Sequence, residues 1–138
     1  MALDEYVDSV LERLDYKRFS LSVLASKWTF FVDQCAEGYD WNIYEFDNEL
    51  SVRDSIEEIL NDPVFKQFYE FGGFVREVHD ADERYRDLLQ PNVKRTSFSE
   101  SWWHTGVLKS AGDEYCSDVL RRYSILVKPF DSDFASED

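Results

Sequence analysis

The densest chemical signal in the sequence is a run of acidic residues between Asp33 and Asp62. This stretch contains ten carboxylates and a single basic residue, Arg53. The carboxylates belong to Asp33, Glu37, Asp40, Glu45, Asp47, Glu49, Asp54, Glu57, Glu58 and Asp62. Like charges repel one another in a compact fold, so such a concentration is costly unless its electric field is useful. A negative surface of this kind attracts a basic partner and speeds the encounter with it.

Large aromatic residues are interleaved with these acids at Tyr39, Trp41, Tyr44 and Phe46. Tyr and Trp are the residues that most often anchor protein interfaces, and we expect Trp41 and Tyr44 to be partly exposed because they lie among charges. The predicted partner-binding residues are Asp40, Trp41, Tyr44, Glu45, Asp47, Glu49, Asp54, Glu57 and Glu58. Two adjacent tryptophans, Trp102 and Trp103, form a second candidate, because successive helical residues do not face the same core.

The residues typical of catalysis and metal binding form no specific pattern. His79 and Glu83 have the i, i+4 spacing that places two ligands on one helix face, but the HExxH arrangement is missing. A solvated helix face is the simpler interpretation there, and His104 is expected to be packed or hydrogen-bonded. There is no G-x-S-x-G elbow and no phosphate-binding glycine motif. We therefore predict no catalytic residues, no metal and no cofactor; a small metal-binding regulator or enzyme using His79 stays an alternative.

The overall charge restricts the classes of partner. The formal net charge is −14, which disfavours direct binding to nucleic acid and to anionic membranes. No apolar run approaches the 18 residues of a transmembrane helix. Residues 1–16 contain acids where a signal peptide has a basic region, and Cys35 and Cys116 are expected to be reduced. These features favour a cytoplasmic protein.

Adaptation to a salt-saturated cytoplasm is another source of acidity. Proteins adapted in this way spread their acids evenly and contain few bulky apolar residues. This chain has 11 Phe, 8 Tyr and 4 Trp, and its acids concentrate in one stretch. The pattern favours an acidic face, and salt adaptation stays open as an alternative.

Hydrophobic spacing predicts the elements that would position these residues. Apolar residues recur at helical intervals, and the expected helices cover 2–15, 21–37, 42–50, 51–60 and 63–89. A last helix carries Tyr115, Cys116, Val119, Leu120 and Tyr123, and its extension over 125–127 stays open. Residues 91–101 are polar, which predicts a loop. We expect an all-α, single-domain bundle of five to six helices over 1–128 with little or no strand, followed by a disordered acidic tail at 129–138.

Individual residues mark the expected helix ends and the core. Ser20 and Asp62 are candidate N-caps, and Gly38 follows the second helix in the usual position of a C-terminal glycine. Gly72 and Gly73 interrupt the longest helical pattern, where they predict a kink or a close helix crossing. The phenylalanines expected in the core are Phe30, Phe31, Phe65, Phe68 and Phe74.

Three segments carry a resemblance to known proteins: Trp28, Gly38-Tyr39 and YEFDNELSVRD from Tyr44 to Asp54. Over residues 28–60 the chain resembles small helical bacterial proteins. It is also similar in size and charge to the immunity proteins of polymorphic toxin and contact-dependent inhibition systems. The resemblance implies an inhibitor that binds and neutralises a toxin in the cytoplasm. It carries over no binding residues.

The sequence thus leads to three functional hypotheses. The first is an immunity protein, not an enzyme, whose acidic aromatic face binds a basic toxin domain, a nuclease. The second is a DNA-mimic inhibitor of a phage or host nucleic-acid-binding protein, and the third is the metal-binding regulator or enzyme. The density of aromatic residues also leaves a homodimer open.

Overall fold

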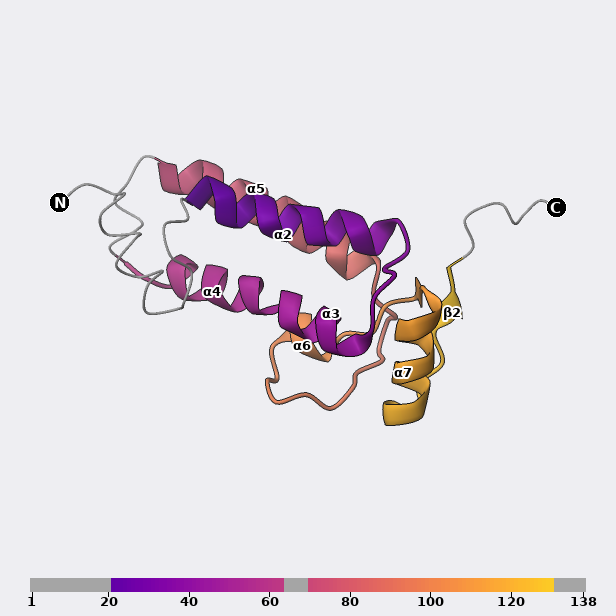
Figure 1. Cartoon of the computed structure of the whole chain (residues 1–138). Coiled ribbons are helices and arrows are strands. Elements are labelled where there is room, and N and C mark those ends of the chain that lie inside the picture. Colours follow the sequence, from indigo (N-terminus) through magenta and orange to yellow (C-terminus); the bar gives the residue numbers. More distant parts are fainter. Residues whose placement is uncertain (1–20, 64–69, 131–138) are drawn as a thin grey trace. The chain divides into compact units, whose positions relative to one another are not determined.

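Helices dominate the chain, as the hydrophobic spacing predicts. The computed structural model describes residues 21–63 and 70–130, and 63% of them are helical (Figure 1). The helices are α2 (Leu21–Ala36), α3 (Ile43–Glu49), α4 (Ser51–Leu60), α5 (Glu70–Asp87), α6 (Trp102–Thr105) and α7 (Asp113–Tyr123), and the strands are β1 (Ser110–Ala111) and β2 (Lys128–Pro129). The all-α class is confirmed. The predicted helix over 2–15, the N-cap at Ser20, Phe65 and Phe68, and the tail beyond 130 lie outside the described residues.

The described residues fall into two compact units. Unit 1 contains residues 21–30, 51–63 and 70–82, and unit 2 contains residues 31–50 and 83–130. Helices α2 and α5 each contribute to both units. The domain boundaries expected from the sequence, 1–128 and 129–138, stay a prediction.

In unit 1, apolar stripes of α2, α4 and α5 are buried. Their fully or nearly buried residues are Leu21, Leu24, Ala25, Trp28, Ile56, Ile59, Phe74, Val78 and Ala81. The stripe of α2 follows the predicted i, i+3, i+4 spacing. The prediction for Phe30 is wrong: this side chain is 64% exposed. It lies two positions after Trp28, so the helix turns it away from the buried stripe.

In unit 2, the chain turns sharply after α2 and restarts at α3. Gly38 adopts a left-handed backbone conformation with φ of +97°, which confirms its predicted role after the helix. The side chain of Asn42 accepts a hydrogen bond from the backbone N–H of Glu45 at 2.8 Å, so it caps α3. The predicted helix from about residue 42 is confirmed.

The C-terminal half of unit 2 holds the small strand segments. Strands β1 and β2 pair in parallel, with Ser110 opposite Lys128, and α7 connects them. The sequence leaves the extension of α7 over 125–127 open, and the helix ends at Tyr123. Ser124 takes a left-handed conformation with φ of 58° and donates its N–H to the carbonyl of Leu120, which closes the last turn.

An aromatic cluster fills the core of unit 2. Phe46 lies at its centre, with ring centroids 5.3 Å from Phe31, 5.2 Å from Tyr39 and 4.9 Å from Tyr115. All four side chains are buried, and their tilted or edge-to-face geometry suits the charge distribution of aromatic rings. This cluster fixes the positions of α3 and α7, whose outward faces carry the candidate site.

Candidate partner-binding site

The first turn of α3 presents exposed aromatic and acidic side chains. Ile43 and Phe46 point into the core of unit 2, so the helix directs Tyr44 and Glu45 outward. Trp41 is 55% exposed and Tyr44 is 62% exposed, which confirms the expectation that these two aromatics are accessible. Such large exposed aromatics are typical of interface anchors.

Helix α7 adds carboxylates that lie about 70 residues further along the chain. Tyr115 and Val119 are buried, whereas Asp113 and Glu114 are exposed in the first turn. The carboxylate of Asp118 accepts a hydrogen bond from the backbone N–H of Ile43 at 3.1 Å, and the Gly112 N–H donates to the Tyr39 carbonyl at 2.7 Å. These two bonds hold the start of α3 against the start of α7.

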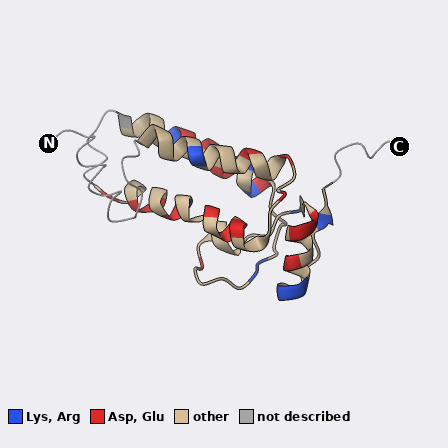
Figure 2. Cartoon of the chain, in the orientation of Figure 1, with Lys and Arg blue, Asp and Glu red and all other residues tan. Residues whose placement is uncertain are grey.

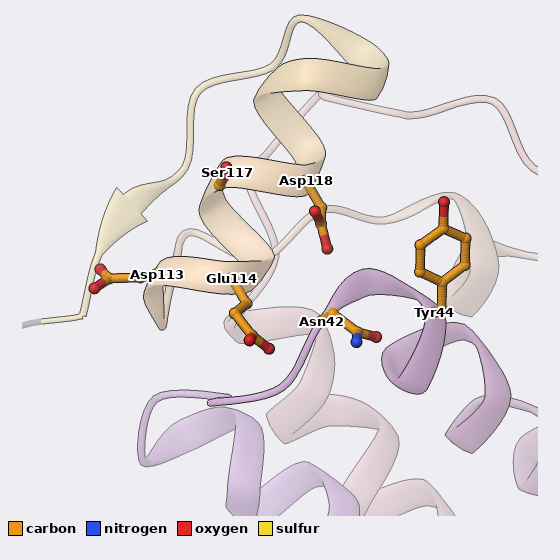
Figure 3. A pocket seen from close by; sticks show the side chains of 6 residues that line it. All are labelled: Asn42, Tyr44, Asp113, Glu114, Ser117 and Asp118. Atoms are coloured by element: carbon orange, nitrogen blue, oxygen red, sulfur yellow. The ribbon is translucent and has the colours of Figure 1, made fainter.

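The start of α3 and helix α7 line an open pocket of about 470 Å³. Its lining residues are Asn42, Tyr44, Asp113, Glu114, Ser117 and Asp118. Figure 3 shows the side chains of Asn42, Glu114 and Asp118 extending into the space between the two helices, with the Tyr44 ring beside them and Asp113 on the far side. Three of the six lining residues are acidic, so the pocket is suited to a positively charged group.

Two arginines of the chain lie next to this pocket, at the last turn of α7. Arg121 donates a hydrogen bond to the Asp118 carboxylate at 2.8 Å, and the Arg122 guanidinium carbon lies 5.0 Å from the centre of the Tyr44 ring. Figure 2 shows the change of sign along α7, from acidic residues to a basic last turn. The placement of acids at the N-terminus and arginines at the C-terminus also stabilises the helix dipole.

We call the following residues of this region the α3–α7 surface: Asp40, Trp41, Tyr44, Glu45, Asp113, Glu114 and the partly buried Asp118. Asp113, Glu114 and Asp118 were missed by sequence reasoning. The α7 periodicity places Asp113 and Glu114 away from the buried residues, so their exposure was visible in the sequence. Their position beside Asn42 and Tyr44 depends on tertiary contacts, which the sequence alone does not reveal.

Two of the predicted interface acids in unit 2 have partners within the fold. Asp47 binds the guanidinium of Arg95, whose side chain is completely buried, and Glu49 accepts a hydrogen bond from the Tyr39 hydroxyl at 2.8 Å. Burial, and then the hydrogen bond to Glu49, raise the pKa of Tyr39 above its ordinary value, so the tyrosine stays protonated. Asp47 and Glu49 therefore stabilise unit 2, and they are less available to a partner than Asp40 or Glu45.

The predicted interface residues Asp54, Glu57 and Glu58 belong to unit 1, on α4. Glu58 is exposed and Asp54 is partly buried. Glu57 accepts a hydrogen bond from Arg53 at 2.8 Å and another from the Asn61 side chain at 3.1 Å. The predicted acidic face is thus divided between the two units, and only Glu58 of these three is fully exposed.

Arg53, the single basic residue of the acidic stretch, is buried in unit 1. Its guanidinium binds both carboxylate oxygens of Asp82, which also accepts a hydrogen bond from the Trp28 indole N–H at 2.9 Å. Burial by itself lowers the pKa of Arg53, but the hydrogen bonds and negative charges of Asp82 and Glu57 outweigh this effect, and the pKa rises. Arg53 stays charged in the core.

The tryptophan pair divides between the core and the surface of unit 2. Trp103 is buried, at 6% exposure. Trp102 is partly exposed and lies under the Arg86 guanidinium, whose carbon is 3.9 Å from the centre of the indole ring. Of this second candidate site, Trp102 alone presents surface to a partner.

The two residues of the alternative metal hypothesis, His79 and Glu83, are both exposed on α5. Asp82, close to them in the sequence, points inward to Arg53. Within 21–63 and 70–130, no three His, Cys, Asp or Glu side chains are grouped as metal ligands. His104 is buried, as expected for a packed histidine, with its ring 4.8 Å from that of Phe98.

None of the helices in the described part of the chain combines the length and the apolar character needed to cross a membrane.

Comparison with known proteins gives the site no further definition. No family model matches the chain, and neither the curated proteins nor the solved structures contain a match. The function must therefore be argued from the surface itself.

Proposed function

We propose that the chain is a non-enzymatic, cytoplasmic binding protein that neutralises a basic partner, and that this partner is a toxin domain with nuclease activity. The observation that carries the proposal is the exposure of Trp41 and Tyr44 among carboxylates on the α3–α7 surface. Exposed aromatic residues among carboxylates are typical of an interface with a positively charged partner.

The proposed mechanism is electrostatic capture followed by aromatic anchoring. A nuclease holds the phosphates of its substrate with lysine and arginine, and these side chains would pair with Asp40, Glu45 and Glu114. The net charge of −14 would accelerate the encounter, since steering by charge raises association rates well above those of neutral proteins. Burial of Trp41 and Tyr44 would then slow dissociation, and the occupied basic site would exclude nucleic acid.

The internal contacts decide which acids are useful in a test. Neutralising Asp47 or Glu57 would disturb an ion pair within the fold, so a loss of binding would have two explanations. Asp40, Glu45 and Glu114 are exposed, and no ion pair joins any of them to another described residue. They are therefore the appropriate positions for charge removal.

Protection of cells tests the proposal. The chain is expressed together with the C-terminal domain of any toxin encoded beside its gene, and survival is followed with and without it. The proposal expects survival with the wild-type chain and loss of survival with Trp41→Ala. Death of the cells despite folded wild-type chain would contradict it.

The same experiment separates the DNA-mimic hypothesis. A DNA mimic would protect a phage or inhibit a host DNA-binding protein, and it would not rescue cells from a toxin domain. Specific, stoichiometric inhibition of a purified DNA-binding protein by the chain, together with failure of toxin rescue, would favour this second hypothesis.

A further inference from the structure

The pocket between α3 and α7 combines a cavity, an aromatic wall and carboxylates. The pocket is open, and its volume of about 470 Å³ is sufficient for a single side chain. Asn42, Glu114 and Asp118 extend into it beside the Tyr44 ring (Figure 3). Asp113 and Glu114 lie in the first turn of α7.

Two arginines of the chain already contact this wall. Arg121 pairs with Asp118, and Arg122 lies over Tyr44. Both arginines are exposed at the end of α7, and Arg122 also lies near the Tyr123 ring. Asp113 and Glu114 form no ion pair with any other residue in the described part of the chain. The pocket therefore has carboxylates available for another cation.

Resting on the proposed function, we infer that this pocket receives one arginine side chain of the basic partner, which replaces Arg122 on the face of Tyr44. A guanidinium fits the lining better than an ammonium. It is planar, so it stacks on an aromatic ring, and its several N–H groups form a fork that pairs with carboxylates. Glu114 provides a carboxylate without an ion pair, Asp118 is already bound by Arg121 and by the Ile43 N–H, and Tyr44 provides the stacking face.

Arg122 should act as a competitor in this arrangement. Its removal uncovers the Tyr44 ring and takes a positive charge from the edge of the pocket. A cation–π contact at an exposed site corresponds to about a two- to fivefold change in affinity. Arg122→Ala should therefore strengthen arginine binding by that factor, and Tyr44→Ala should weaken it by a similar one.

A titration that needs no natural partner tests the inference. The isotope-labelled full chain is titrated with Nα-acetyl-arginine methylamide and, separately, with the neutral citrulline analogue, while the backbone amides are followed by NMR. The inference expects saturable shifts for the arginine compound that are confined to amides near residues 42–45 and 113–118, with none for citrulline. Glu114→Gln should weaken binding, whereas the charge-matched control Glu83→Gln, exposed on α5, should leave it unchanged.

Shifts spread evenly over all acidic residues, or equal shifts with citrulline, would overturn the inference. Spectra of the variants show whether each one is folded, and Tyr44→Phe keeps the ring as a second control. The titration tests the pocket, and the protection experiment tests the proposed function, so their outcomes are distinguishable. Protection without arginine binding in the pocket refutes the pocket alone, and arginine binding without protection against any basic nuclease domain refutes the proposed function.

Discussion

Both carboxylate oxygens of Asp82 bind the guanidinium of Arg53: Oδ1 accepts a hydrogen bond from Nε at 2.9 Å, and Oδ2 accepts one from Nη2 at 2.8 Å. Each side chain is only 4% exposed. The two residues lie on α4 and α5, and the Trp28 indole of α2 completes the group. A buried, doubly hydrogen-bonded pair of this kind ties the three helices of unit 1 together.

Removal of Asp82 should strongly destabilise unit 1. Asp82→Ala leaves the Arg53 charge buried without its main partner, and breaking a buried pair in this way costs about 3–5 kcal/mol. The free energy of unfolding from urea titration measures the loss. Asp80→Ala, on an exposed position of the same helix, is the matched control and should change stability by less than about 0.5 kcal/mol. Equal losses in the two variants would contradict the structural role of Asp82.

The ion pair between Asp47 and Arg95 should respond unequally to removal of either partner. Asp47→Ala leaves the completely buried Arg95 without its carboxylate partner and should lower the free energy of unfolding by about 3 kcal/mol. Arg95→Met removes the buried charge and keeps an apolar side chain of similar length, so it should cost less. Unfolding of both variants in urea tests this order. A larger loss for Arg95→Met would show that the guanidinium is well solvated in the folded state.

Gly73 is a position where a substitution should stabilise the protein. A Cβ atom at Gly73 would meet no described atom within 4 Å, so the close helix crossing predicted at Gly72-Gly73 is not found among the described residues. Gly73 is exposed and lies within α5, so Gly73→Ala should add about 1 kcal/mol to the free energy of unfolding.

Gly38 is the contrasting position. Its φ is +97°, and a Cβ there would come within 2.4 Å of the Phe130 ring, so Gly38→Ala should destabilise unit 2 by about 1–2 kcal/mol. Thermal unfolding of the two variants should give melting temperatures that move in opposite directions. Stabilisation of both by alanine would contradict the backbone conformation at Gly38.

Stability should decrease at alkaline pH because of buried tyrosines. Burial raises the pKa of Tyr85 and of Tyr115 above the ordinary tyrosine value. The unfolded chain therefore loses these protons near pH 10, before the folded chain does, and each tyrosine lowers stability by about 1.4 kcal/mol per pH unit above that point. Urea unfolding at pH 8 and pH 11 measures the effect. Tyr85→Phe should reduce the alkaline loss, and an undiminished loss in this variant would contradict the role of the buried hydroxyl.

Local patterns in the sequence were sufficient to predict most helices. The stripe of Leu24, Trp28 and Phe31 identified α2, and Gly38 identified its end, because both signals depend on neighbours along the chain. The end of α7 stayed open in the sequence because Ser124 adopts a left-handed conformation at a position where glycine is more usual.

The burial of charged residues could not be predicted from the sequence. Arg53 and Arg95 have polar neighbours in the sequence, and arginines are usually exposed. Their partners, Asp82 and Asp47, lie 29 and 48 residues away. The same limit applies to the candidate site: Trp41 and Tyr44 were expected at the surface, but the acids of α7 join them through tertiary contacts such as the hydrogen bond from the Ile43 N–H to Asp118.

The central claim is that carboxylates of the α3–α7 surface capture a basic protein. Two charge-matched triple variants test it: Asp40→Asn/Glu45→Gln/Glu114→Gln on the surface, and Glu83→Gln/Asp87→Asn/Glu100→Gln at exposed positions elsewhere in unit 2. The association rate with the purified toxin domain is measured by stopped flow at low and high salt. The account predicts that the surface variant associates at least about tenfold more slowly at low salt and loses most of its salt dependence, while the control stays close to the wild type. Equal rates for the two triple variants would contradict it.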